Sequence, residues 1–210
     1  MIKLHCFGES GNAYKAALTL ELSGAEWVPE YVDFFNGGAR TEAFLALNVM
    51  GEVPVMEDGD LVLTQSGVIQ DYVSSKTGKL GGRSAAERRD VLRWMFFDNH
   101  KVSGVAGGLR FQMNFLPEDK RNPDIIAFLS ARLHGALKIL ETQLGDTRYL
   151  TGDDLTIADI ACVGYLFYPE PFSFVRADHP HIDAWMTRIE GTPGWKHPYD
   201  LMPGSPADRA

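Results

Sequence analysis

Residues 48–56 read Asn-Val-Met-Gly-Glu-Val-Pro-Val-Met, and residues 61–66 read Leu-Val-Leu-Thr-Gln-Ser. The first piece ends and the second begins in a short, mostly apolar run with β-branched residues, and Asp58-Gly59 between the two runs is a strong hairpin signal. A helical pattern follows, with apolar residues spaced for one buried face. The stretch therefore predicts two short antiparallel strands and then a helix that begins at Ser66.

Two positions in this stretch suggest ligand binding. The Val53-Pro54 bond lies at the mouth of the first strand, where it can adopt the cis form. That form would leave the backbone of Val53 as a free hydrogen-bonding edge. Ser66 is at the start of a helix, so its hydroxyl and the nearby N–H groups form an anion site. We therefore expect a receptor for a small peptide that carries a carboxylate.

The preceding residues complete an α/β domain. A strand at residues 2–7, a helix at 13–23 and a strand at 27–34 predict a parallel pair with a right-handed crossover. A short helix at 41–47 then leads into the hairpin. The order βαβ, α, ββα is that of a thioredoxin-like domain, which we place at residues 1–78.

A helical domain is expected after a glycine-containing linker at residues 79–84. Ser84 and Glu87 form a capping box at the start of this second domain, residues 85–210. The tail from Pro198, which also carries Pro203 and Pro206, is expected to be extended or disordered. The predicted helices span about 85–115, 123–144, 156–168 and 180–190.

Composition narrows the range of partners. The chain has 210 residues and a net charge of −8, which argues against a broad grip on nucleic acid or an anionic membrane. Cys6 and Cys162 are far apart, so we expect no disulfide framework and a reducing cytoplasm. The N-terminus lacks a signal-peptide profile. No zinc-ligand spacing, Walker loop or dinucleotide fingerprint is present, so we expect no metal and no redox cofactor.

The segment from Asp154 to Asp159, Asp-Leu-Thr-Ile-Ala-Asp, is similar to the capping motif of the helical domain in glutathione transferases. Together with the Val53-Pro54 hairpin, it gives nearly the whole chain a resemblance to that superfamily, of the cytosolic, bacterial-like type. Its residues also form a capping box, Thr156 to Asp159, which favours a structural role for Asp159. The resemblance implies a thioredoxin-like domain followed by an all-α domain.

The resemblance also implies a binding site for glutathione. Val53, before Pro54, would exchange backbone hydrogen bonds with the cysteinyl part, an instance of strand addition. Gln65 and Ser66 would hold the γ-glutamyl end, although many family members carry an acidic residue in place of Gln65. Arg40, or alternatively Lys15, would contact the glycyl carboxylate.

The loop between the first strand and the first helix would face the glutathione sulfur. Ser10 or Asn12 could donate a hydrogen bond to the thiolate, although both residues are also suited to cap the helix. Tyr14, one turn into the helix, is expected to pack or to support the loop. Cys6 lies within the strand and is expected to be a small buried residue rather than a redox thiol.

The leading hypothesis is a cytoplasmic detoxification enzyme that conjugates glutathione, as co-substrate, to a hydrophobic small-molecule electrophile. By resemblance it would be a homodimer, with the first domain of each subunit against the helices of the other. Two alternatives remain open at this point: a non-catalytic glutathione-binding or interaction module, and a glutathione-dependent disulfide reductase or isomerase. The predicted liners of the electrophile pocket are Phe97, His100, Lys101 and Phe111.

Overall fold

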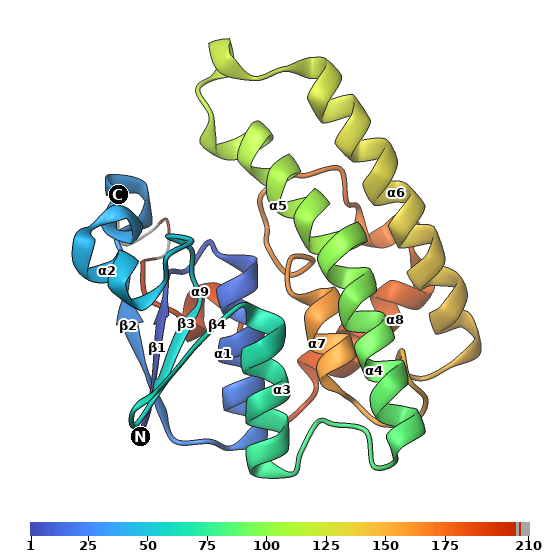
Figure 1. Ribbon diagram of the computed structural model, residues 1–210. Helices are drawn as coiled ribbons and strands as arrows, with labels where there is room; N and C mark the ends of the chain where they lie inside the picture. The colour runs from blue at the N-terminus through green and yellow to red at the C-terminus, as the bar shows by residue number, and fades with distance from the viewer. Residues whose placement is uncertain (205, 207–210) are drawn as a thin grey trace. The chain divides into compact units, whose positions relative to one another are not determined.

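A four-stranded sheet forms the centre of the first of two units in the computed structural model, which describes residues 1–204 and 206 (Figure 1). The sheet comprises β1 (Ile2–Cys6), β2 (Trp27–Tyr31), β3 (Val55–Asp58) and β4 (Leu61–Thr64) in the order β2-β1-β3-β4. The β1–β2 pair is parallel and the other two pairs are antiparallel. The predicted parallel pair and the predicted hairpin are both confirmed.

Helices cover both faces of this sheet. α1 (Gly11–Ser23) and α3 (Ser66–Thr77) pack against each other on one face, and the shorter α2 (Glu42–Leu47) lies on the other (Figure 1). The His5 ring meets the Phe44 ring of α2 edge-on, with centroids 6.1 Å apart. Because side chains alternate along a strand, the buried Leu4 and Cys6 point to the opposite face.

Residues 192–204 also belong to the first unit, whereas the sequence-based division assigned everything from 85 to 210 to the helical domain. The Tyr14 hydroxyl donates to the carbonyl of Lys196 at 2.9 Å, and Lys196 Nζ lies 2.7 Å from Glu21 Oε1. The short helix α9 (Pro198–Leu201) packs against α1. The tail from Pro198 is thus helical at its start rather than extended, while residues 205 and 207–210 lie outside the described residues.

The second unit, Gly82–Gly191, is helical. The predicted helix at 85–115 is confirmed as a continuous segment with two π-helical stretches: α4 (Ala85–Phe97), η3 (Asp98–Ser103), α5 (Gly104–Arg110) and η4 (Phe111–Phe115). The Ser84 hydroxyl accepts from the Glu87 N–H at 3.2 Å, which fixes the first turn. The unit continues with α6 (Pro123–Asp146), α7 (Ile157–Val163) and α8 (Pro180–Glu190), of which α7 ends sooner than predicted.

Asp159 is fully buried at the start of α7 and accepts four hydrogen bonds. Oδ2 accepts from the N–H and the hydroxyl of Thr156, at 2.9 and 3.0 Å. Oδ1 accepts from the N–H of Leu150 at 2.8 Å and from Nε1 of Trp185 at 2.9 Å. Burial raises the pKa of the Asp159 carboxyl, while these four bonds oppose the rise. The predicted capping box is confirmed, and it also links two helices and a loop.

Candidate active site

Ser10 caps α1, and its O–H remains available. The hydroxyl oxygen accepts from the Ala13 N–H at 3.2 Å, as the capping interpretation predicted. No described residue accepts a hydrogen bond from this hydroxyl. Because a serine oxygen can accept one bond while its proton donates another, the cap and a thiolate donor are compatible roles. The half-buried Ser10 can therefore cap the helix and bind an anion at once.

Asn12, two residues further on, is fixed by a buried lysine. Its Oδ1 accepts from Lys15 Nζ at 3.1 Å, and the Lys15 side chain is only 1% exposed. Lys15 is therefore buried beside the loop and cannot reach out to the glycyl carboxylate of a bound peptide. Of the two predicted cations, Arg40 remains the candidate for that contact. The amide nitrogen of Asn12 donates to no described residue, so Asn12 stays a second candidate donor toward a ligand.

The neighbouring Tyr14 and Cys6 have the structural roles expected of them. The Tyr14 side chain is buried, and its hydroxyl is occupied by the Lys196 carbonyl. Cys6 is buried in β1, where desolvation raises the pKa of its thiol to about 12. A thiol with that pKa stays protonated near neutral pH and is a poor nucleophile.

The loop before β3 presents an unpaired backbone edge. The Val53-Pro54 bond is cis, as expected. Within the described residues, neither the N–H nor the C=O of Val53 forms a hydrogen bond, although the residue is largely buried. Buried backbone groups are almost always paired in proteins. Val53 is therefore suited to pair with an extended peptide.

Two residues of this loop were missed by sequence reasoning. Asn48 is buried at the end of α2, where its Oδ1 accepts from the Met50 N–H at 3.1 Å and its Nδ2 donates to the Glu52 carbonyl at 2.7 Å. Asparagine before a glycine-containing turn is a signal that could have identified Asn48. Met50 contacts two predicted ligand-binding residues, Arg40 and Gln65, and no sequence pattern indicated these contacts.

Gln65 and Ser66 form an open helix start. Gln65 precedes α3 with a φ of 68°, which is unusual for a residue other than glycine, and its side chain caps nothing. Within the described part of the chain, the N–H groups of Ser66, Gly67 and Val68 have no acceptor. Unpaired donors at a helix N-terminus bind anions, and strained backbone often accompanies function.

Arg40 and Gln65 converge on Met50 from two sides. Arg40 Nη1 donates to the Met50 carbonyl at 3.4 Å, and Gln65 Nε2 donates to the Met50 sulfur at 3.2 Å. Gly51, with a φ of 61°, lies so close to Arg40 that a Cβ there would be 2.5 Å from Nη1. The first unit thus gathers two of the predicted side chains around one loop.

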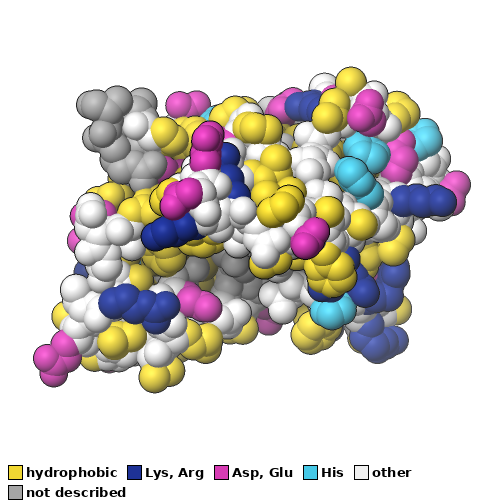
Figure 2. Space-filling model, turned by 90° about the horizontal axis from the view of Figure 1, so that it is seen from above, with side chains coloured by type: hydrophobic (Ala, Val, Ile, Leu, Met, Phe, Trp, Pro, Cys, Tyr) yellow, Lys and Arg dark blue, Asp and Glu magenta, His cyan; other side chains and the backbone are white. Residues whose placement is uncertain are grey.

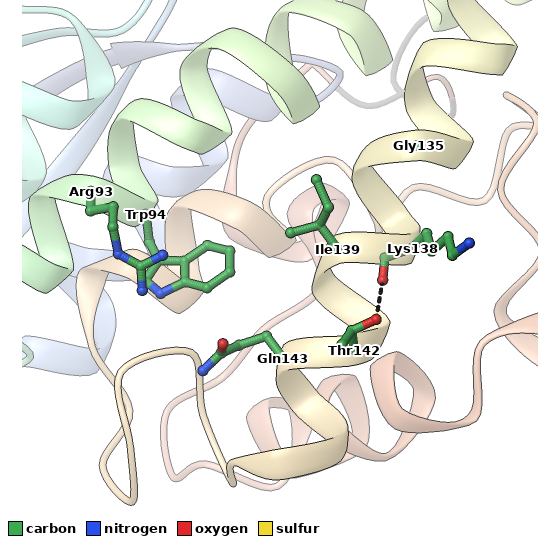
Figure 3. Close-up of a pocket in the computed structure, with 7 residues that line it drawn as sticks. All are labelled: Arg93, Trp94, Gly135, Lys138, Ile139, Thr142 and Gln143. Atoms are coloured by element: carbon green, nitrogen blue, oxygen red, sulfur yellow. Dashed lines mark hydrogen bonds between the residues drawn. The ribbon is translucent and has the colours of Figure 1, made fainter.

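In the helical unit, the predicted pocket liners lie along one segment. Phe97 is half-buried and packs edge-on against Trp94 with centroids 5.2 Å apart, so it serves the core in part. His100, Lys101 and Phe111 are exposed on η3 and η4. A separate groove of about 370 Å³ between α4 and α6 includes none of them (Figure 3). Its residues include Arg93, stacked 4.7 Å from the Trp94 ring, Ile139, Thr142 and Gln143.

Other classes of site are not evident. Across residues 1–204 and 206, no group of three or more His, Cys, Asp or Glu side chains could hold a metal ion. None of the described helices is long and apolar enough to cross a bilayer. The open groups described above are hydrogen-bond donors and one backbone edge, which suit a peptide with carboxylates.

Comparison with known proteins decides the family. The protein-family model for the glutathione S-transferase N-terminal domain matches residues 2–75, and the family model for the C-terminal domain matches residues 120–193. The chain belongs to the glutathione S-transferase family. Glutathione S-transferase F14 of Arabidopsis thaliana is 30% identical over 96% of this chain and 86% of its own length.

Solved structures agree with this assignment. A glutathione S-transferase from Pseudomonas fluorescens is 33% identical, with a TM-score of 0.88 over 95% of this chain and 99% of that one. A glutathione transferase from Burkholderia graminis, 25% identical with a TM-score of 0.83, covers 92% of this chain and 85% of that one. Its structure holds two glutathione molecules per subunit. The predicted fold is confirmed, and the predicted transferase activity is supported.

Proposed function

We propose that this transferase binds glutathione along the loop at residues 48–54 and conjugates its thiolate to a hydrophobic electrophile. The observation that carries the proposal is the pair of open features in the first unit. One is the unpaired backbone of Val53, and the other is the uncapped start of α3 at Ser66. An extended tripeptide needs both: a strand partner for its middle and donors for its terminal carboxylate.

Each end of glutathione finds a matching group. The γ-glutamyl carboxylate would bind the Ser66 hydroxyl and the open N–H groups, assisted by the positive end of the helix. The Gln65 amide oxygen would accept from the γ-glutamyl ammonium. Arg40, held beside the Met50 carbonyl, would contact the glycyl carboxylate. The Ser10 hydroxyl would donate to the sulfur, with Asn12 as the second candidate.

A steady-state assay with glutathione and a chlorinated nitroaromatic tests this function. We expect saturable formation of the thioether product, with calorimetry showing glutathione binding in the absence of the electrophile. Binding without turnover would instead support a non-catalytic module. Exchange with a mixed disulfide that survives Ser10→Ala would support a reductase, although the buried Cys6 offers no obvious thiolate for it.

A gain of affinity is expected when Gln65 becomes glutamate. The neutral amide can accept from the γ-glutamyl ammonium but adds no charge, whereas a carboxylate at the same position adds the attraction between opposite charges. We therefore expect Gln65→Glu to lower the KM for glutathione by about threefold to tenfold. Steady-state kinetics would measure the change. A glutathione analogue that lacks the γ-glutamyl amino group is the control, and an equal gain with that analogue would contradict the assignment of Gln65.

We also propose a homodimer, since apolar side chains are exposed on the helical unit. Phe96 is 72% exposed and lies one turn after the exposed Leu92 on α4, while Phe128 and Ile139 are exposed on α6. Contiguous exposed apolar residues mark interaction surfaces. The first unit also exposes apolar residues, Val62 on β4 and Val68 on α3, which could face the partner's helices.

Replacing Phe96 with glutamate is expected to shift the protein toward monomer. A charge placed in an apolar interface must be desolvated without a partner, which weakens association strongly. Sedimentation equilibrium would measure the change in mass. Val175→Glu is the matched control, because Val175 is similarly exposed but lies outside both helices. Equal masses for the wild type and the Phe96 variant would argue against this interface.

The charge on the surface favours a small-molecule ligand over nucleic acid. Acidic, basic and apolar side chains are interspersed on the face of the molecule seen in Figure 2. Together with the net charge of −8, this gives little attraction for a polyanion. We further propose a cytoplasmic location, supported by Cys6 and Cys162, which are both buried and form no disulfide among the described residues.

A further inference from the structure

Met50 is an exposed methionine in the middle of the proposed glutathione site. The residue is 46% exposed, and its sulfur accepts a hydrogen bond from Gln65 Nε2 at 3.2 Å. Its carbonyl accepts from Arg40 Nη1 at 3.4 Å. A chemical change at this sulfur would therefore alter the hydrogen bond to Gln65 directly. If the loop moved as a result, the hydrogen bond between Arg40 and the Met50 carbonyl would change as well.

The other methionines differ from Met50 in exposure or in position. The chain contains seven methionines. Met113 is half-buried in the helical unit, and Met1 is the exposed chain start. Four more are buried in the core: Met56, Met95, Met186 and Met202. Since oxidation of methionine depends on access to the sulfur, Met50 is the methionine beside the proposed site that a small oxidant can reach.

The backbone around Met50 has little freedom to adjust. Asn48 holds the Met50 N–H at 3.1 Å, and Gly51 leaves no room between the loop and Arg40. An oxygen added to the sulfur must therefore be accommodated by side chains, of which Gln65 is the nearest hydrogen-bonding one. Sulfoxide oxygen is a much stronger acceptor than a thioether sulfur. The Gln65 Nε2 would then bond to the added oxygen instead of to the sulfur. This would shift the whole amide and move its Oε1 away from the position where it would accept from the γ-glutamyl ammonium.

We infer that Met50 is an oxidation site through which hydroperoxides weaken glutathione binding, an inference that rests on the proposed function. The sulfur lone pair attacks one peroxide oxygen, the O–O bond breaks and an S–O bond forms. The second oxygen leaves as water or an alcohol after taking up the proton. The sulfur is oxidised by two electrons and the hydroperoxide is reduced by two. Methionine sulfoxide reductases reverse the change.

Oxidation is expected to raise the KM for glutathione by about fivefold, the effect of losing one hydrogen bond of ordinary strength. The kcat at saturating glutathione should change little, because Gln65 binds the ground state and the transition state alike. The effect is therefore a loss of affinity rather than a loss of chemistry.

The test treats the whole protein with limiting hydrogen peroxide, locates the sulfoxide by peptide mass spectrometry and measures KM and kcat before and after. We expect Met50 to oxidise before Met113, the KM to rise and reductase treatment to restore it. In Met50→Leu the ratio of KM values before and after peroxide should stay near one. Met113→Leu, the matched control, should remain as sensitive as the wild type.

Three results would overturn the inference. Met50 could oxidise no faster than the less accessible methionines, its oxidation could leave the KM unchanged, or Met50→Leu could remain peroxide-sensitive. Each of these leaves the proposed function intact, provided that the untreated protein binds and conjugates glutathione. A failure of the untreated protein to bind glutathione would overturn the proposed function and this inference together.

Discussion

Replacing Asp159 with alanine is expected to lower the free energy of unfolding by about 3–5 kcal/mol, which is large for one residue. The change removes the acceptor for four hydrogen bonds and leaves buried donors of Leu150, Thr156 and Trp185 without partners. Each buried donor left unsatisfied costs about 1–3 kcal/mol. For a chain of this length the melting temperature should fall by about 10 °C.

Thermal and urea unfolding would measure this loss, with Asp154→Ala as the matched control. Asp154 lies five residues earlier and pairs with Arg83 at 2.6 Å, but both side chains are exposed. An exposed pair contributes less than about 1 kcal/mol. The loss of stability in Asp159→Asn should lie between those of Asp159→Ala and Asp154→Ala. The asparagine amide keeps one oxygen as an acceptor, but its N–H₂ group would face donors that the second carboxylate oxygen now satisfies. An Asp159→Ala protein as stable as the Asp154 variant would show that the buried network is not stabilising.

Replacing Ser10 with alanine is expected to lower kcat/KM near neutral pH by about 10-fold to 100-fold. The hydroxyl donates to the thiolate in the proposed complex, and a hydrogen bond to a charged group contributes about 1.5–3 kcal/mol. The pKa of bound glutathione should rise by about one to two units, toward the value of about 8.5 for a free thiol. Activity measured across pH and the ultraviolet absorbance of the bound thiolate would show both changes.

The pH profile also separates this chemical role from capping. The deficit of the Ser10 variant should shrink as pH rises, because the thiol then ionises without assistance. Ser84→Ala is the matched control, since Ser84 caps α4 with a bond of the same length, 3.2 Å, in the other unit. Both variants should lose about 1 kcal/mol of stability. Asn12→Ala tests the second candidate, and a thiol pKa that rises only in that variant would transfer the role to Asn12.

Local signals account for what the sequence predicted well. The hairpin at Asp58-Gly59 and the capping box at Thr156 are each fixed by a few neighbouring residues. The helix at 85–115 follows from apolar periodicity over many turns. Such features survive folding because tertiary contacts reinforce the local preference.

Long-range contacts account for what the sequence did not predict. The assignment of residues 192–204 to the first unit depends on bonds from Tyr14 and Glu21, more than 170 positions away in the chain. The positive φ of Gln65 and the position of Met50 between Gln65 and Arg40 are likewise set by packing around the loop. The burial of Lys15 beside Asn12 had no pattern to signal it, because lysine is usually exposed.

A crystal structure of the complex with glutathione tests the central claim most directly. The account predicts that the cysteinyl backbone pairs with Val53, that the γ-glutamyl carboxylate lies at the start of α3 beside Ser66 and that the sulfur lies within hydrogen-bonding distance of Ser10 Oγ. A complex in which the tripeptide binds elsewhere, or leaves the Val53 backbone and the α3 N-terminus unpaired, would contradict it.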